Sequence, residues 1–337
     1  MFLRLSGRPI LTCVALDACG AYSSEVSLKK VLSFENTKEK RFFFCILLTY
    51  LYLCNMKKML FLMLAMLFAT LQTADAQQYT KKDSVRVMEL LAEAKRQKSD
   101  TNWMVFFGRK LRDVPYVAKT LEINKEERLI VNLRKLDCTT LVENALALTL
   151  CMKNNQTNFK DYCRFLRLIR YRNGSVSYID RLHYFTDWIE DNTRLGFVKE
   201  RAFPKAMPTA KQTLRIDYMS THIDQYPMLV VHPKWGKEIA ESERALTGKT
   251  YPYIPKNQIA NNKIFRENIH DGDILAITTS KKGLDTSHVG IAVWHKDGLH
   301  LLNASMIHKK VVEEPMTLWQ YMQKHPSQTG IRVIRVL

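Results

Sequence analysis

The chain lacks the composition and motifs of several large protein classes. Glycine and proline are scarce, with 12 and 10 residues in 337, so fibrous and disordered classes are excluded. No internal repeat or low-complexity linker divides the sequence. It contains no Cys-x-x-Cys pair and no His-rich spacing, so no zinc site is expected. Nucleic-acid-binding motifs are also missing. We expect no metal and no cofactor.

An apolar run with the flanks of a secretory signal peptide lies well inside the chain. Met56-Lys57-Lys58 gives a charged start, residues 59–71 are apolar, and a small-x-small pattern ends at Ala76. The run is shorter than the roughly 20 residues that cross a bilayer. We therefore predict that residues 1–55 are an extension from a start codon assigned too early, that 56–76 are a signal peptide, and that 77–337 form a single domain. The alternatives are an uncleaved anchor, or two spans with residues 42–53 as the first.

Cleavage after Ala76 would change the charge and the cysteine count. It would leave 42 Lys and Arg against 28 Asp and Glu. A basic exported protein suits an anionic partner such as a wall polymer or a membrane surface, and export argues against nucleic acid. Cys138, Cys151 and Cys163 would remain, and an odd number leaves at least one thiol unpaired. Cys151 and Cys163 are expected in helices as core residues.

The expected secondary structure changes from helical to β along the mature chain. Capping signals and periodicity predict helices at about 83–98, 102–111, 124–133, 138–152, 158–173 and 183–195. Strand patterns follow at 214–219, 228–231, 273–279, 288–295, 300–304, 308–312 and 331–336, with helices at 233–246 and 317–324 and an irregular connection at 251–262. We predict one α+β domain, with N-terminal helices packed on a C-terminal antiparallel sheet.

Three residues have the chemistry of a thiol hydrolase. Cys138 follows Asp137 at an expected helix start, where backbone N–H groups and the helix dipole favour a thiolate and can hold an oxyanion. His288 begins a strand, and alternation points it to the same face as Gly290, whose small size leaves room for a close approach. Asn303 on the paired strand could accept from the ring N–H and fix its tautomer. Taken singly, each residue fits an ordinary core or turn position better.

Five segments in this order resemble the NlpC-type cysteine peptidases and amidases. They are Pro115-Tyr116, Asp137-Cys138, 271–275 (DGDIL), 288–291 (HVGI) and 303–305 (NAS). The likeness covers about residues 110–337. The long spacing between Cys138 and His288, the Thr139-Thr140 pair and the missing Gly-Gly after Pro-Tyr depart from the small domains of this type.

The chain looks like the larger NlpC-like family long labelled a domain of unknown function. That resemblance implies a papain-like fold with a long insertion between nucleophile and base. It also implies N-acetylmuramoyl-L-alanine amidase activity on small muropeptides, cutting between the lactyl group of the sugar and L-Ala. A periplasmic location and a monomer without a membrane anchor are expected with it.

The resemblance also implies roles for individual residues. Cys138 would attack, His288 would be the base, Asn303 would orient the ring, and Tyr116 would help the Cys138 N–H to hold the oxyanion. Six further residues are expected to bind the substrate: Arg181, His183, Tyr184, Asp187, Trp188 and Ser287. Those at 181–188 include aromatic faces and charges, which suit an anionic sugar-peptide. Alternatively, the stretch around 181–189 is an amphipathic helix whose apolar side chains lie in the core, and His183 is an alternative base.

Other functions remain open at this point. An endopeptidase cutting between D-Glu and the diamino acid would use the same groups. A protein of a different class, which binds the cell wall without hydrolysing it, would have an inert Cys138. A thiol acyltransferase would need a lipid-facing apolar patch, which the sequence does not indicate.

We expect N-terminal sequencing of the exported protein to begin at Gln77, because cleavage is predicted after Ala76. Recovery of any residue from before Met56 would contradict the late start.

Overall fold

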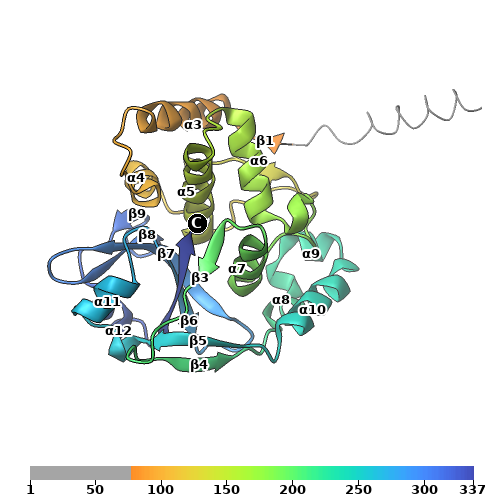
Figure 1. Ribbon diagram of the computed structural model, residues 1–337. Helices are drawn as coiled ribbons and strands as arrows, with labels where there is room; N and C mark the ends of the chain where they lie inside the picture. Colours follow the sequence, from red (N-terminus) through yellow and green to blue (C-terminus); the bar gives the residue numbers. More distant parts are fainter. Residues whose placement is uncertain (1–76) are drawn as a thin grey trace, which may run out of the picture. The chain divides into compact units, whose positions relative to one another are not determined.

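The computed structural model describes residues 77–337 (Figure 1). The predicted extension at 1–55 and signal peptide at 56–76 lie outside the described residues, and both stay predictions. All described residues belong to one compact unit. None of the helices in this part of the chain is long and apolar enough to cross a membrane.

Five α-helices lie in the first half of the described chain. They are α3 (Lys81–Ala94), α4 (Trp103–Lys110), α5 (Cys138–Lys153), α6 (Phe159–Arg170) and α7 (Phe185–Arg194). The first four begin where a side-chain oxygen accepts a backbone N–H from the first turn, at Thr80, Asn102, Asp137 and Asn158. Such caps satisfy N–H groups that have no partner within the helix.

Shorter helices follow. They are α8 (Tyr218–Thr221), α9 (Pro227–Val231), α10 (Trp235–Leu246), α11 (Lys263–Asn268) and α12 (Leu318–Gln323), with 3-10 turns at Arg172–Gly174, Ile223–Gln225 and Lys256–Gln258.

The central sheet is antiparallel throughout. Its strands run in the order β4-β5-β10-β6-β7-β8-β9, and β3 also pairs with β10. The strands are β3 (Val198–Glu200), β4 (Ala210–Thr213), β5 (Thr250–Pro255), β6 (Ile274–Thr279), β7 (Thr286–Trp294), β8 (Leu299–Ser305), β9 (Lys310–Glu313) and β10 (Gln328–Val336). A separate parallel pair joins β1 (Gln77–Gln78) to β2 (Leu129–Ile130).

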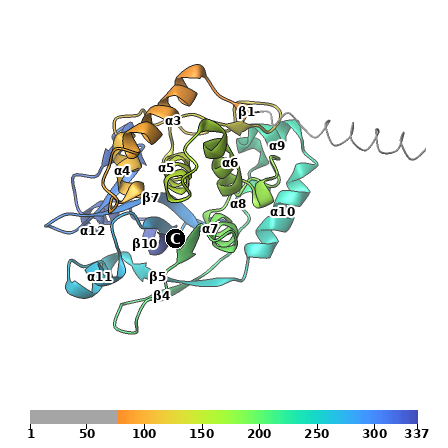
Figure 2. The ribbon, with the colours of Figure 1, turned by 45° about the horizontal axis from the view of Figure 1, so that its top comes forward.

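Helices cover both faces of this sheet (Figures 1 and 2). Successive side chains of a strand point to opposite faces, and β6 shows the result. Ile274 and Ala276 join a core shared with α3 to α7, whereas Leu275 and Ile277 join a second core with α11 and α12. The papain-like fold is a narrower expectation than this arrangement and stays a prediction.

Helix α5 lies in the middle of the first core. Every residue from Thr140 to Cys151 is buried, as expected of a helix surrounded by other elements. Its one acidic group, Glu143, accepts from Arg170 Nε at 2.7 Å, and both side chains are almost completely buried. Arg170 also donates to the Ile130 carbonyl, at 2.7 Å.

The segment between α7 and β5 has a hydrophobic core of its own. Side chains of α8 to α10 pack there with Tyr178 and Tyr184. The predicted strand at 228–231 is wrong, since α9 covers it. The one at 214–219 is also wrong, because Ile216 makes only an isolated bridge to Gly283 and α8 begins at Tyr218. Short apolar runs do not distinguish a strand from a buried helix.

Two further expectations were wrong. Residues 124–133 are not helical, because Glu127 does not cap a helix but accepts from the Tyr171 hydroxyl at 2.6 Å, and β2 follows. The connection at 251–262 was expected to be irregular, yet it contains most of β5, which pairs with both β4 and β10.

We expect Arg170→Met to lower the free energy of unfolding by about 3–5 kcal/mol, because it leaves Glu143 buried without its cation. Urea denaturation would measure this. Arg244→Met is the matched control, because its ion pair with Glu241 is exposed and such pairs contribute little. Equal stability of the two variants would contradict a structural role for the buried pair.

Candidate active site

Cys138 is the first residue of α5, and the segment before it is held on two sides. Asp137 Oδ1 accepts from the Thr140 N–H at 2.8 Å, which fixes the start of the helix. Leu136 donates to the Pro115 carbonyl at 3.0 Å and accepts from the Val117 N–H at 2.9 Å. These contacts align the Pro-Tyr motif with the residues that lead into the helix.

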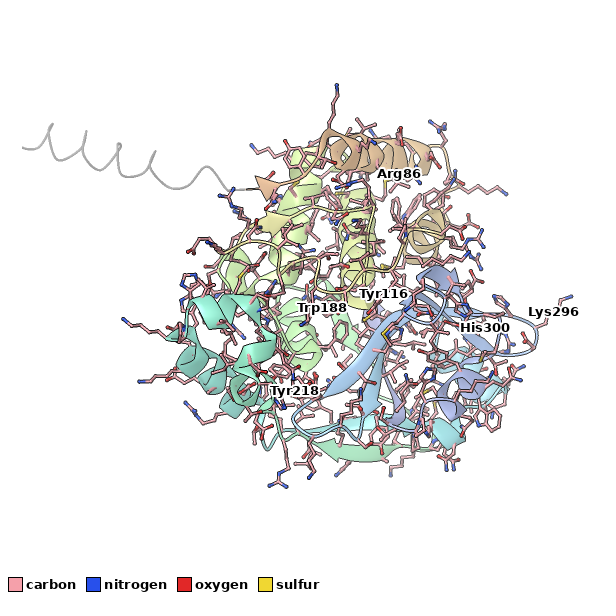
Figure 3. The ribbon with its side chains drawn as sticks, turned by 180° about the vertical axis from the view of Figure 1, so that it is seen from behind. Arg86, Tyr116, Trp188, Tyr218, Lys296 and His300 are labelled. Atoms are coloured by element: carbon pink, nitrogen blue, oxygen red, sulfur yellow. The ribbon has the colours of Figure 1, made fainter. Side chains whose placement is uncertain are left out.

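Tyr116 therefore lies next to the start of α5 (Figure 3). Its backbone N–H donates to the Lys309 carbonyl at 2.9 Å, so the β8–β9 hairpin also holds it. The pKa of its hydroxyl is raised by burial first, and then by the neighbouring Cys138 and Asp137. The structure thus brings Tyr116 and Cys138 together.

His288 and Asn303 are joined across β7 and β8. His288 Nε2 lies 2.9 Å from Asn303 Oδ1, and Asn303 is fully buried. The strand register shifts just before the histidine, because His288 pairs with Ile277 whereas Thr286 pairs with Thr278. Ser287 is the extra residue of a β-bulge, a feature that re-aims neighbouring side chains.

Gly290 has a packing role. A Cβ atom at this position would lie 2.7 Å from Leu301 Cδ1 and 2.9 Å from the Leu302 carbonyl oxygen, closer than real contacts allow. The close approach expected at Gly290 is therefore made by the neighbouring strand and not by a ligand.

One cavity of about 210 Å³ has both Cys138 and His288 in its wall. Met219 and Tyr226 contribute from the segment between α7 and β5. The remaining lining residues are Thr139, Leu182, His183, Tyr184, Phe185, Leu284, Asp285, Thr286, Ser287 and Val289. Residues far apart in sequence thus line one cavity beside the thiol.

The Cys138 thiol is a weaker acid than the sequence suggested. Burial, and next the Asp137 carboxylate, raise its pKa to about 12, although hydrogen bonds from the Val289 N–H and from Thr139 act in the opposite direction. The expectation that the helix start lowers the thiol pKa is thus corrected, because the cost of burying a thiolate outweighs the helix amides.

The imidazole is also neutral near pH 7. Burial lowers the pKa of His288, and the hydrogen bond with Asn303 raises it by less. Between these two described side chains there is no direct hydrogen bond. The resting pair is therefore a neutral thiol and a neutral ring on one cavity wall.

Three of the expected contact residues are engaged inside the protein. Arg181 pairs with Glu122 and lies 3.7 Å from Glu127. Asp187 pairs with Arg172. Trp188 is fully buried (Figure 3) and stacks on Phe185 with ring centroids 4.7 Å apart. None of the three lines the cavity.

His183, Tyr184 and Ser287 do line it. The Tyr184 hydroxyl donates to Glu243 at 2.6 Å. His183 Nε2 donates to the Tyr178 carbonyl at 2.7 Å. Burial lowers the pKa of His183 to about 3, which makes it a poor base. Ser287 Oγ is buried and has no protein partner.

Sequence reasoning missed several groups at this site. Asp285 is buried and accepts the N–H groups of Thr186 and Thr286 at 2.6 and 2.7 Å. Met219 and Tyr226 reach the wall only because their segment folds against it. No spacing in the sequence relates them to Cys138, so no motif could have found them.

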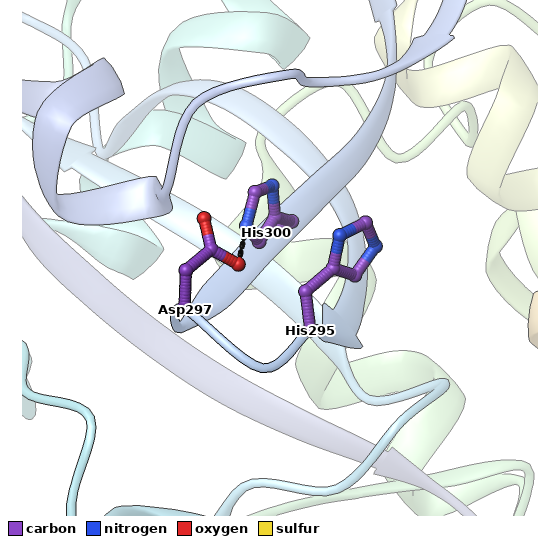
Figure 4. A group of neighbouring side chains, drawn as sticks. All are labelled: His295, Asp297 and His300. Atoms are coloured by element: carbon purple, nitrogen blue, oxygen red, sulfur yellow. Dashed lines mark hydrogen bonds and ion pairs between the residues drawn. The ribbon is translucent and has the colours of Figure 1, made fainter.

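A second group of titratable side chains lies at the β7–β8 turn. His295, Asp297 and His300 bring three ligand-type atoms within 4.8 Å of one another (Figure 4). The two rings stack, with centroids 4.0 Å apart and planes inclined by 18°. A metal ion bound by an imidazole nitrogen lies in the plane of the ring. Because the planes of two stacked rings are nearly parallel, no nearby ion can lie in both. The cluster as arranged is therefore no metal site.

Comparison with known proteins identifies similar chains. Residues 106–331 match the model of a family described as AmiA-like, N-acetylmuramoyl-L-alanine amidase-like. An N-acetylmuramoyl-L-alanine amidase structure from Bacteroides uniformis ATCC 8492 is 40% identical, covering 69% of this chain and 97% of that one, with a TM-score of 0.65. A Bacteroides fragilis structure with a provisional xylanase name is 41% identical, covering 68% and 99%, with a TM-score of 0.63.

A Legionella pneumophila protein of the DUF1460 family is 22% identical, covers 76% of this chain and 95% of its own, and has a TM-score of 0.61. This last likeness concerns the fold alone. No curated protein matches the chain. The NlpC-type assignment is corrected by these findings, because the family model that matches is AmiA-like.

We expect the rate of Cys138 alkylation by iodoacetamide to rise steadily from pH 7 to pH 10 without a plateau. A thiol whose pKa is raised to about 12 gains thiolate throughout this range, and only the thiolate reacts. Mass spectrometry of the Cys138 peptide would follow the rate. A plateau below pH 8 would show instead that a thiolate–imidazolium pair is present at rest.

Proposed function

The chain belongs to the AmiA-like family of N-acetylmuramoyl-L-alanine amidase-like cell-wall hydrolases, and we propose that it cleaves small muropeptides with Cys138 as nucleophile. The bond is the amide between the lactyl group and L-Ala. One observation supports the cysteine mechanism: Cys138 and His288 lie in the wall of the same cavity, and Asn303 is hydrogen-bonded to the His288 ring.

The first half of the reaction forms a thioester. Sγ of Cys138 attacks the amide carbonyl as its proton passes to His288, so the neutral resting pair becomes charged only in the transition state. The oxyanion accepts hydrogen bonds from the Cys138 N–H and the Tyr116 hydroxyl. The C–N bond then breaks, and His288 returns the proton to the amine of L-Ala.

The second half regenerates the enzyme. Water attacks the thioester carbonyl while His288 takes a proton from it. The C–S bond breaks and the proton returns to Sγ. The lactyl group leaves as a carboxylic acid, which then ionises by releasing the second proton of the water to solvent. Atoms and charge balance without a cofactor.

The family implies a peptidoglycan-related substrate, and the cavity favours fragments over intact polymer. Its volume is only about 210 Å³, and Met219 and Tyr226 form part of its wall, so it suits a small fragment better than a long glycan strand. Export to the periplasm is part of the proposal and rests on the signal peptide predicted at 56–76. There the protein would meet fragments released during wall turnover.

The cavity does not suit glycoside hydrolysis, the reaction of a xylanase. That reaction generally needs two carboxyl groups about 5–10 Å apart. Of the residues that line the described cavity, only Asp285 has one, and both of its oxygens already accept backbone N–H groups. An amide is therefore the better substrate for this site.

We expect the mature protein to release a free tetrapeptide from a disaccharide tetrapeptide with an anhydro-muramic end, because the proposed cut frees the amine of L-Ala. Cys138→Ala should abolish release, and Cys151→Ala, which changes a buried thiol outside the cavity, should not. Mass spectrometry of the products would decide.

A dipeptide product would favour the endopeptidase. Absence of any cleavage, together with a Cys138 inert to iodoacetamide, would favour a wall-binding protein without enzymatic activity.

A further inference from the structure

Glu314 is a buried acid directly behind the His288–Asn303 pair. It follows β9, and its side chain is only 2% exposed. One carboxylate oxygen accepts from Asn303 Nδ2 at 3.1 Å, and the other contacts His308 Nε2 at 3.1 Å. Within the described chain, no Lys or Arg pairs with it. Four side chains thus form a continuous line from the cavity to the β8–β9 hairpin.

The direction of each hydrogen bond in this line is set by Glu314. A carboxylate only accepts, so Asn303 must turn its NH₂ group toward it. The same NH₂ group also donates to the Leu301 carbonyl, at 3.3 Å. Asn303 Oδ1 consequently faces His288, and His288 Nε2 must carry the hydrogen.

This tautomer leaves His288 Nδ1 with the lone pair that a base needs. If the Asn303 amide were reversed, its NH₂ group would face Nε2. The ring hydrogen would then move to Nδ1, and the nitrogen available to the cavity could no longer accept a proton. The orientation of one buried amide therefore decides whether the imidazole can act as a base.

We propose that Glu314 is a positioning residue that holds Asn303, and through it the Nε2–H tautomer of His288. The expected effect on the rate of hydrolysis rests on the proposed function, whereas the expected effect on the His288 tautomer does not. The charge of Glu314 also favours protonation of the ring and partly offsets its burial. His308, whose side chain is 35% exposed, completes the line at the surface.

A purely structural role does not account for Glu314. Burying a carboxylate that no Lys or Arg side chain pairs with costs free energy that burying an apolar side chain would not. The neighbouring Glu313 provides the comparison, because it binds Arg109 at 2.8 Å and His295 instead and does not contact Asn303. Of these two adjacent acids, only Glu314 is linked to His288, through Asn303.

The test compares Glu314→Leu and Glu314→Gln with Glu313→Gln as the matched control. In the substrate-free, ¹⁵N-labelled protein, NMR reads the tautomer and the pKa of His288 without reference to any substrate. The leucine variant should lose the pure Nε2–H tautomer, whereas the glutamine variant should keep it, because its carbonyl can still accept from Asn303. Asp137, Cys138 and Tyr321, the other titratable groups near the ring, are the same in all variants.

Activity provides the second measurement. We expect the leucine variant to lose roughly 10- to 100-fold in kcat with little change in KM, since a wrong tautomer weakens proton transfer more than binding. Glutamine should restore most of the loss, and Glu313→Gln should match the wild type. If the leucine variant does not fold, the glutamine variant alone tests the inference. Its His288 should have a lower pKa than in the wild type, because the negative charge of Glu314 is gone.

An unchanged tautomer in a folded leucine variant, or an unchanged His288 pKa in the glutamine variant, would overturn the inference. If the leucine variant shows the expected tautomer change but the wild-type protein hydrolyses no muropeptide, only the proposed function would be overturned.

Discussion

The position of α5 is the constraint on which the site depends. This helix is enclosed by other helices and by the sheet, so it cannot shift without opening the first core. Glu143 and Arg170 strengthen that constraint, because a buried ion pair is costly to separate. Since Cys138 is the first residue of the helix, its sulfur has one place, beside the Val289 N–H. The proposed nucleophile is therefore held by the core and not by a loop.

His288, the proposed base, is fixed independently, by strand pairing. The bulge at Ser287 and the tight packing of Gly290 on Leu301 set where His288 points, and Asn303 and Glu314 set its hydrogen. The two halves of the site meet because α5 packs against β7 and β8. Both reacting groups, the Cys138 thiol and the His288 ring, are uncharged at rest. In the proposed mechanism the proton therefore passes from the thiol to the ring only once substrate is bound.

Local features were the most predictable from sequence. The cap at Asp137 predicted where α5 starts, and the strand patterns at 288–295 and 300–304 predicted the two strands of the β7–β8 hairpin. In the turn between them the His295 N–H donates to the Gly298 carbonyl at 2.8 Å. Properties that depend on tertiary packing were not predictable. The thiol pKa was misjudged because burial is invisible to local sequence, and Glu314 belongs to no motif. Short ordered motifs also suggested the wrong family, since they reflect shared chemistry more than common membership.

The segment between α7 and β5 folds around a core of its own yet contributes Met219 and Tyr226 to the cavity. The buried apolar residues of its helices α8 to α10 belong to that core and not to the one that surrounds α5. Selection can therefore reshape the cavity wall while the reacting groups stay in register. Relatives that keep the proposed nucleophile and base could therefore differ in the fragments that their cavities accept. Substitutions in this segment are the way to alter fragment preference by design.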